Sequence, residues 1–148
     1  MLKKKLHNHC ENYIRKKLEI LEKRKDELKL ALESEDKSSA GDKHETGRAM
    51  IQLEREKIGI QISENEQVLK KYISCQKPSN NDNVRIGSIV ITTNLNYYLS
   101  IPAEFLKIDS NIFYCVSPLS PIGKLLLGKK VKAEIYFNKK TSKILEIM

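Results

Sequence analysis

Two acidic side chains, Asp42 and Glu45, stand three positions apart directly after a glycine, in the segment Gly41-Asp-Lys-His-Glu45. If a helix begins near Asp42, both carboxylates lie on one helix face, where they could bind a single hydrated cation. Two carboxylates are too few to hold Mg²⁺ alone, so the pattern is typical of a metal ion shared with the active site of another protein. The same spacing fits helix capping, with Asp42 as the N-cap and Glu45 at the third helical position, and the two interpretations are compatible.

Charge changes sign along the first part of the chain. The formal net charge is +8, which favours a polyanionic partner because clustered cations bind phosphate by releasing counterions. An ordinary solvated helix surface explains many of these cations equally well. The cations are concentrated before residue 30, at Lys3, Lys4, Lys5, Arg15, Lys16, Lys17, Lys23, Arg24, Lys25 and Lys29. Three further acids lie close to Asp42, namely Glu33, Glu35 and Asp36.

A second group of potential ligands, His7, His9 and Cys10, is not expected to bind a metal. Only His7 and Cys10 would share a helix face, and no fourth ligand is evident. The cysteines Cys10, Cys75 and Cys115 are odd in number and widely spaced, so we expect reduced thiols and no disulfide framework. No apolar run approaches the roughly 18 residues that a membrane span requires. We therefore expect a cytoplasmic protein with no membrane partner.

A long helical hairpin is expected to position the acidic pair. Residues 2–32 contain no Gly or Pro, and their apolar residues recur at alternating spacings of four and three, with Lys25 in one seam position. A polar turn is expected over residues 33–42, followed by a second helix over 45–74 whose seam is interrupted by Arg55 and Asn65. Neither seam can be buried alone, so residues 1–75 are predicted to form an antiparallel coiled coil with its acidic tip near residues 33–45. The seam residues are Ile14, Leu18, Leu21, Leu28 and Leu32, then Ile51, Ile58, Ile62, Leu69 and Tyr72.

The pattern changes after a polar linker at residues 76–83. Residues 84–148 contain short apolar runs that are typical of strands. The strands are expected at 85–92, 97–101, 111–116, 131–137 and 143–147. Ser120 at a cap position, Pro121 in a first turn and Gly128 just past the end indicate one short helix. The predicted fold class is therefore α+β, with a helical hairpin followed by a small, mostly antiparallel β-rich domain.

Two segments resemble the bacterial Gre transcript-cleavage factors, GreA and GreB. The segment 41–45 is similar to the Gly-Asp-x-x-Glu element at the hairpin tip of that family. The segment Ser117-Pro-Leu-Ser-Pro-Ile-Gly-Lys-Leu-Leu-Leu-Gly-Lys129 resembles the Ser-Pro, short helix, Gly-Lys segment of the family's FKBP-like C-terminal domain, and Gly87-Ser88-Ile-Val also fits. Because the hairpin comes first and the β-rich domain second, the resemblance covers nearly the whole chain.

The resemblance implies a transcription elongation factor that is not an enzyme by itself. Its FKBP-like domain would dock on RNA polymerase, and its coiled coil would enter the secondary channel. Asp42 and Glu45 would then share Mg²⁺ with the polymerase active site and stimulate cleavage of backtracked RNA at the nascent 3′ end. A monomer is expected, and an indirect contact with DNA is left open. The docking residues would be Ser120, Pro121, Gly128 and Lys129, and the residues that contact RNA would be Lys16, Lys17 and Arg24.

Three alternatives stay open. The family commonly has Asn, Tyr and Arg where this chain has Thr46, Ala49 and Leu53, which favours a Gre-like regulator or inhibitor of RNA polymerase without cleavage activity. A peptidyl-prolyl isomerase would need an apolar pocket lined with aromatic residues, for which three phenylalanines and no tryptophan are a poor set. A generic coiled-coil interaction protein would leave the acidic tip and the β-rich domain unexplained. The phenylalanines are Phe105, Phe113 and Phe137.

Overall fold

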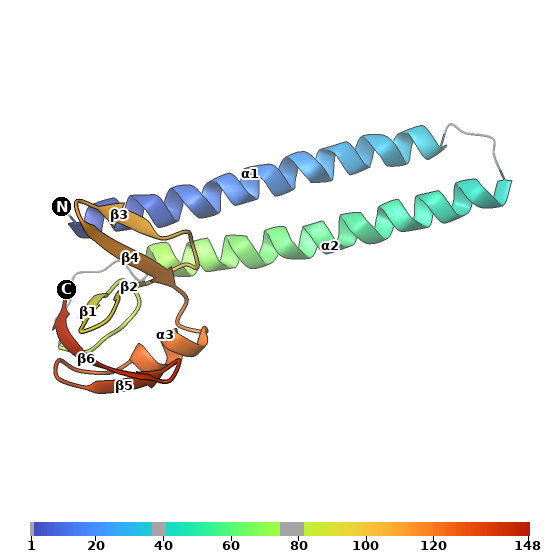
Figure 1. Ribbon diagram of the computed structural model, residues 1–148. Helices are drawn as coiled ribbons and strands as arrows, with labels where there is room; N and C mark the ends of the chain where they lie inside the picture. The colour runs from blue at the N-terminus through green and yellow to red at the C-terminus, as the bar shows by residue number, and fades with distance from the viewer. Residues whose placement is uncertain (1, 37–40, 75–81) are drawn as a thin grey trace. The chain divides into compact units, whose positions relative to one another are not determined.

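The computed structural model describes residues 2–36, 41–74 and 82–148, and the side chains of residues 36 and 41–44 are outside the described part (Figure 1). Two long helices come first and a six-stranded sheet with one short helix follows, so the predicted α+β fold class is confirmed. The helices are α1 (Leu2–Asp36), α2 (Gly41–Ser74) and α3 (Pro121–Leu126). The strands are β1 (Ile89–Thr92), β2 (Asn96–Leu99), β3 (Leu106–Ile108), β4 (Asn111–Val116), β5 (Glu134–Phe137) and β6 (Lys140–Ile147).

The two long helices extend further than the sequence pattern predicted. The polar turn was expected over residues 33–42, but α1 continues to Asp36 and α2 already begins at Gly41. The residues at the end of α1 are polar, yet none is Gly or Pro, so nothing in their backbone stops the helix. A polar composition was therefore a poor guide to the end of this helix.

Residues Arg15–Gln67 form one compact unit, the distal part of the hairpin. Leu28, Ile58 and Ile62 are buried together in it, which confirms the predicted seam. An exposed ion pair also joins the two arms, with a guanidinium nitrogen of Arg24 lying 2.9 Å from a carboxylate oxygen of Glu54. Further seam residues pack against the buried cluster, namely Leu18, Leu21 and Ile51.

The second compact unit combines Met1–Ile14 with Val68–Met148. Its sheet has the strand order β3-β4-β2-β1-β6-β5, and every neighbouring pair is antiparallel except β2 and β4, which are parallel. Strand β3 was not predicted, because its three residues are too short to show an alternating pattern. Leu106–Ile108 is held as an edge strand by its antiparallel pairing with β4.

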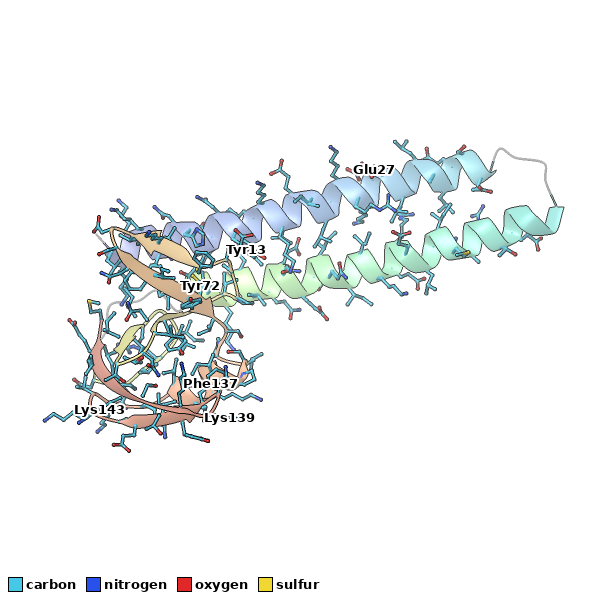
Figure 2. All side chains as sticks on the ribbon, in the orientation of Figure 1. Tyr13, Glu27, Tyr72, Phe137, Lys139 and Lys143 are labelled. Carbon is cyan, nitrogen blue, oxygen red and sulfur yellow. The ribbon has the colours of Figure 1, made fainter. Side chains whose placement is uncertain are left out.

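The two faces of the sheet are covered by different parts of this unit. One face carries Val90 and Tyr97, and its buried cluster includes Ile122 and Leu126 of α3. The strand register places Tyr98 next to Ile89 and Cys115, so these three side chains share the opposite face. There the ends of α1 and α2 that belong to this unit contact the sheet, as the Tyr72 side chain in Figure 2 illustrates.

Turn residues explain why several strands begin later or earlier than predicted. β1 begins at Ile89 because Gly87, with a φ of 93°, adopts a left-handed conformation before it. β6 begins at Lys140 because Asn138 and Lys139, with φ values of 52° and 62°, make a tight turn after β5. Asn-Lys is not the Asn-Gly pair that announces such a hairpin in a sequence, so the strand was predicted to start only at residue 143.

The predicted division into a hairpin of residues 1–75, a linker of residues 76–83 and a domain of residues 84–148 stays a prediction. Most of that linker is outside the described residues. Contacts divide the chain at different places, because the first turns of α1 and the end of α2 belong with the sheet. Within the described residues, no helix is long and apolar enough to cross a membrane.

Candidate functional site

The predicted acidic pair lies in the first turns of α2. Asp42 is the second residue of this helix and Glu45 the fifth, so the helix that their shared face requires is present. The Glu45 side chain is exposed, whereas that of Asp42 is outside the described part. Since α2 begins at Gly41, Asp42 lies inside the helix and not at the N-cap position that the capping interpretation gave it. Carboxylates in this first turn also stabilise the helix through its dipole.

The end of α1 brings further carboxylates to the same end of the hairpin. Glu33 is exposed in the last turns of α1, and Glu35 is partly buried. Glu35 lies beside Gly47 of α2, since a Cβ atom added at Gly47 would be 3.6 Å from the carboxylate of Glu35, an ordinary contact distance. The distal end of the hairpin is therefore acidic on both helices.

The cations predicted to contact RNA differ in their surroundings. Lys16 and Lys17 are exposed, and neither has an ion pair within the described part of the chain. Arg24 is also exposed, but it lies 2.9 Å from Glu54 and 3.4 Å from Glu27. Its hydrogen bond with Glu54 raises the pKa of Arg24 above its usual value. The sequence pattern did not predict that Arg24 links the two arms.

The predicted docking segment begins with a capped helix. Ser120 accepts a hydrogen bond of 3.1 Å from the backbone nitrogen of Gly123, and Pro121 stands at the first helical position, as the sequence indicated. The Ser120 hydroxyl also donates to the carbonyl oxygen of Ser117 at 2.6 Å. Ser120 therefore holds the loop before the helix in place, while Pro121 is exposed.

Gly123 makes this arrangement possible. A Cβ atom at position 123 would lie 1.9 Å from the carbonyl oxygen of Ser117 and 2.9 Å from Cα of Pro118. Both distances are too short for a Cβ atom, so a side chain at this position would clash with the loop. The loop can pack directly on the helix backbone only because residue 123 has no side chain. Gly123 was not among the predicted docking residues, although a glycine inside a short helix was a signal in the sequence that could have identified it.

The end of the segment is tied to Val84, a buried residue that precedes β1. Gly128 donates a hydrogen bond of 2.7 Å to the carbonyl oxygen of Val84, and the backbone nitrogen of Val84 donates to Lys129 at 2.8 Å. Gly128 and Lys129 are exposed, and Gly128 has a φ of 82° that favours glycine. Both ends of the predicted docking segment are therefore fixed by backbone hydrogen bonds.

Leu119 is the most exposed large apolar side chain of the segment, at 77%. Its backbone nitrogen is held by the Ser117 hydroxyl at 3.1 Å, so the loop presents it at a defined position. Leu119 and Pro121 thus give the segment an apolar surface, and Lys124 and Lys129 add two exposed positive charges. Leu119 was not among the predicted docking residues.

The three residues that could have suggested a metal site bind different partners. Nδ1 of His7 lies 3.0 Å from the Tyr72 hydroxyl, and Nε2 of His9 lies 2.8 Å from the carbonyl oxygen of Glu104. The thiol of Cys10 lies 3.3 Å from the hydroxyl of Ser100. Across the part of the chain that the structure describes, no cluster of three or more His, Cys, Asp or Glu residues could hold a metal ion.

Comparison with known proteins leaves the function open. No protein-family model matches the chain, and no curated protein matches it. The solved structure of the transcription factor Gfh1 is similar, with 22% sequence identity over 94% of this chain and 93% of that chain and a TM-score of 0.36. A structural similarity with this TM-score does not support a function. The proposed function therefore rests on the residues of this chain and their geometry.

Proposed function

We propose that this chain is a Gre-like transcription factor that binds RNA polymerase and inserts its helical hairpin into the secondary channel. The observation that carries this proposal is a long hairpin with carboxylates on both helices at its distal end, in one chain with a sheet unit that presents a fixed, exposed loop. A narrow two-helix arm suits insertion into a channel, and a rigid loop suits docking at its rim. We further propose that it acts as a cytoplasmic monomer, with Lys16 and Lys17 beside the nascent RNA.

Docking is assigned to the segment Ser117–Lys129. The hairpin surface is mainly charged and exposed, and such contacts give weak, salt-sensitive binding. The loop of the segment is preorganised by its hydrogen bonds, and its exposed Leu119 could fill a pocket on the partner as an apolar anchor. In the full-length protein, Leu119→Ser should weaken polymerase binding about tenfold, as the loss of one apolar anchor would. Leu145→Ser is the matched control, because Leu145 is also exposed but lies on β6 outside the segment.

Cleavage is assigned to Asp42 and Glu45. Their position on one face of α2, with Glu45 exposed, fits two oxygen ligands for a hydrated Mg²⁺ whose other ligands belong to the polymerase. Mg²⁺ bound there would stabilise charge on the phosphate and activate water. The role of this chain is to place anionic oxygens at the polymerase active site, and the polymerase itself cleaves the RNA.

The decisive experiment adds purified variants to stalled elongation complexes and measures release of 3′ RNA fragments. Asp42→Asn and Glu45→Gln keep the side-chain size but remove the anion, so each should abolish stimulated release and leave polymerase binding nearly intact. Lys43→Ala is the control in the same turn, since this substitution leaves both carboxylates in the sequence. Cleavage at the wild-type rate by both amide variants would reduce Asp42 and Glu45 to residues that stabilise the helix end.

A second candidate is a polymerase regulator that docks in the same way but does not stimulate cleavage. It is favoured by three exposed residues of α2, Thr46, Ala49 and Leu53, which differ from the Asn, Tyr and Arg of the Gre pattern. If the wild-type protein binds polymerase and yields no fragments above the polymerase's own background, this second function replaces the first.

A further inference from the structure

A cavity in the distal part of the hairpin is lined by neither the acidic pair nor the docking segment. Its volume is about 390 Å³. Lys25 and Leu32 of α1 line it from one arm, and Gln52, Arg55 and Glu56 of α2 line it from the other. Both Lys25 and Arg55 occupy seam positions, where the heptad pattern calls for apolar side chains, and both are partly buried. Two cations from opposite arms therefore meet one cavity.

This arrangement is unfavourable for the hairpin alone. Like charges repel, and partial burial removes water that would solvate them. No hydrogen bond or ion pair of Lys25 or Arg55 is found within residues 2–36, 41–74 and 82–148. Arg24, the neighbour of Lys25 in sequence, is by contrast bound by Glu54. Glu56 brings one carboxylate to the cavity wall, so the two cations still outnumber the acid.

Gly59 leaves open space on the same side of α2. It follows Arg55 by four residues and Glu56 by three, which places it on their helix face. Glycine inside a helix is less stable than alanine, and a Cβ atom at position 59 would meet nothing within 4 Å. Packing therefore does not require glycine here.

We propose that Lys25, Arg55 and Gln52 form a binding site for a phosphate-bearing ligand of nucleotide size. The guanidinium of Arg55 can hold two phosphate oxygens at once, Lys25 adds a point charge, and the amide of Gln52 adds a donor. Leu32 gives a base or sugar an apolar wall, and the cavity volume is in the range of small-ligand sites. The phosphate comes either from a free nucleotide or from one unit of an RNA strand, and only the second source rests on the proposed function.

The test measures binding to the full-length protein without polymerase. The probes are a nucleoside triphosphate and a short single-stranded oligoribonucleotide, each at low and moderate salt. Lys25→Met and Arg55→Met should each weaken binding at least tenfold and raise the thermal midpoint, because methionine completes the apolar seam. Gly59→Ala should also raise the midpoint but leave binding unchanged, because Gly59 does not line the cavity. Binding of the triphosphate identifies a free nucleotide as a source, and binding of RNA alone identifies the strand.

Matched controls separate a built site from general positive charge. Lys29→Met and Lys57→Met remove one exposed cation from each arm outside the cavity and should change binding less than threefold. Equal loss in these controls would overturn the site. The proposed site would also be overturned if Lys25→Met and Arg55→Met bound both probes like wild type. The same holds if these variants bind like wild type and change the oligomeric state, because Lys25 and Arg55 would then serve to fix the pairing register of the helices. Polymerase cleavage is scored separately, so failure here leaves the proposed function standing, and failure of cleavage leaves this site standing.

Discussion

The hydroxyl groups of Tyr72 on α2 and Tyr98 on β2 lie 2.6 Å apart. The Tyr72 hydroxyl also lies 3.0 Å from Nδ1 of His7, and the rings of Tyr72 and His7 stack with their centroids 5.1 Å apart. Nε2 of His7 lies 3.2 Å from a carboxylate oxygen of Glu11. A hydrogen-bonded chain therefore runs from the sheet through α2 to α1, and Tyr72 is its centre.

Replacing Tyr72 by Phe should destabilise the protein by about 1–3 kcal/mol, because the buried Tyr98 hydroxyl and His7 would lose their common partner. Chemical unfolding followed by circular dichroism measures this change. Tyr13→Phe is the control, since Tyr13 is partly buried on α1 and should change stability by less than about 0.5 kcal/mol. A loss of similar size in both variants would mean that the chain of hydrogen bonds contributes little.

Stability should fall at high pH. Burial, followed by the hydrogen bond with Tyr98, raises the pKa of Tyr72 above its ordinary value of 10.0. The folded protein then keeps a proton that the unfolded chain releases, so the contribution of Tyr72 to stability is fully present below about pH 10 and is lost as the pH rises further. Unfolding curves between about pH 8 and pH 11 should show this decline, and Tyr72→Phe should reduce its slope. Identical slopes for the two proteins would contradict the assignment.

Two glycine substitutions should have opposite effects. Gly123→Ala forces a Cβ atom against the backbone of Ser117 and should cost about 1–3 kcal/mol or prevent folding of the segment. Gly59→Ala meets no atom and should stabilise α2 by up to about 1 kcal/mol. The thermal unfolding midpoint of each variant, compared with that of the wild type, measures both effects. Equal effects would show that the loop before α3 can move away at little cost.

The ion pair between Arg24 and Glu54 should contribute little to stability. Both side chains are exposed, and salt screens such pairs. A double-mutant cycle with Arg24→Gln and Glu54→Gln should therefore give a coupling that is small at low salt and vanishes at high salt. A coupling that persists at high salt would instead mean that the pair fixes the register of the two arms.

The thiols of Cys10 and Cys115 should react slowly with alkylating reagents. Both are buried and free, and the hydrogen bond that the Cys115 thiol donates to Cys10, followed by burial, raises the pKa of Cys115. Reaction requires exposed thiolate, so the rate should follow local opening of the helix from the sheet. Mass spectrometry in a Cys75→Ser background measures it, with denatured protein as the reference. Fast labelling of the folded protein would show that this contact opens readily.

The regular parts of this chain could be predicted from sequence because their signals are local. The seam repeats every few residues, and the serine, proline and glycine around α3 mark its limits within a single segment. The hydrogen bond between Tyr72 and Tyr98 could not be predicted, since no local pattern records which helix covers which sheet face. Cys10 and Cys115 are likewise brought together only by the fold. Polar residues at the end of α1 misled the prediction, because composition alone does not stop a helix.

The same long-range pairing affects how the chain is made. Leu6 and Cys10 are 0% exposed, yet they belong to one unit with residues 68–148. During synthesis these residues leave the ribosome long before the strands that cover them. Their apolar side chains are therefore exposed to solvent, or bound by a chaperone, until those strands have been made. Contacts between such distant segments also slow folding. We expect the sheet unit to complete its folding only after β6 has been synthesised, because β6 pairs with β1 inside the sheet, whereas the distal hairpin can form earlier.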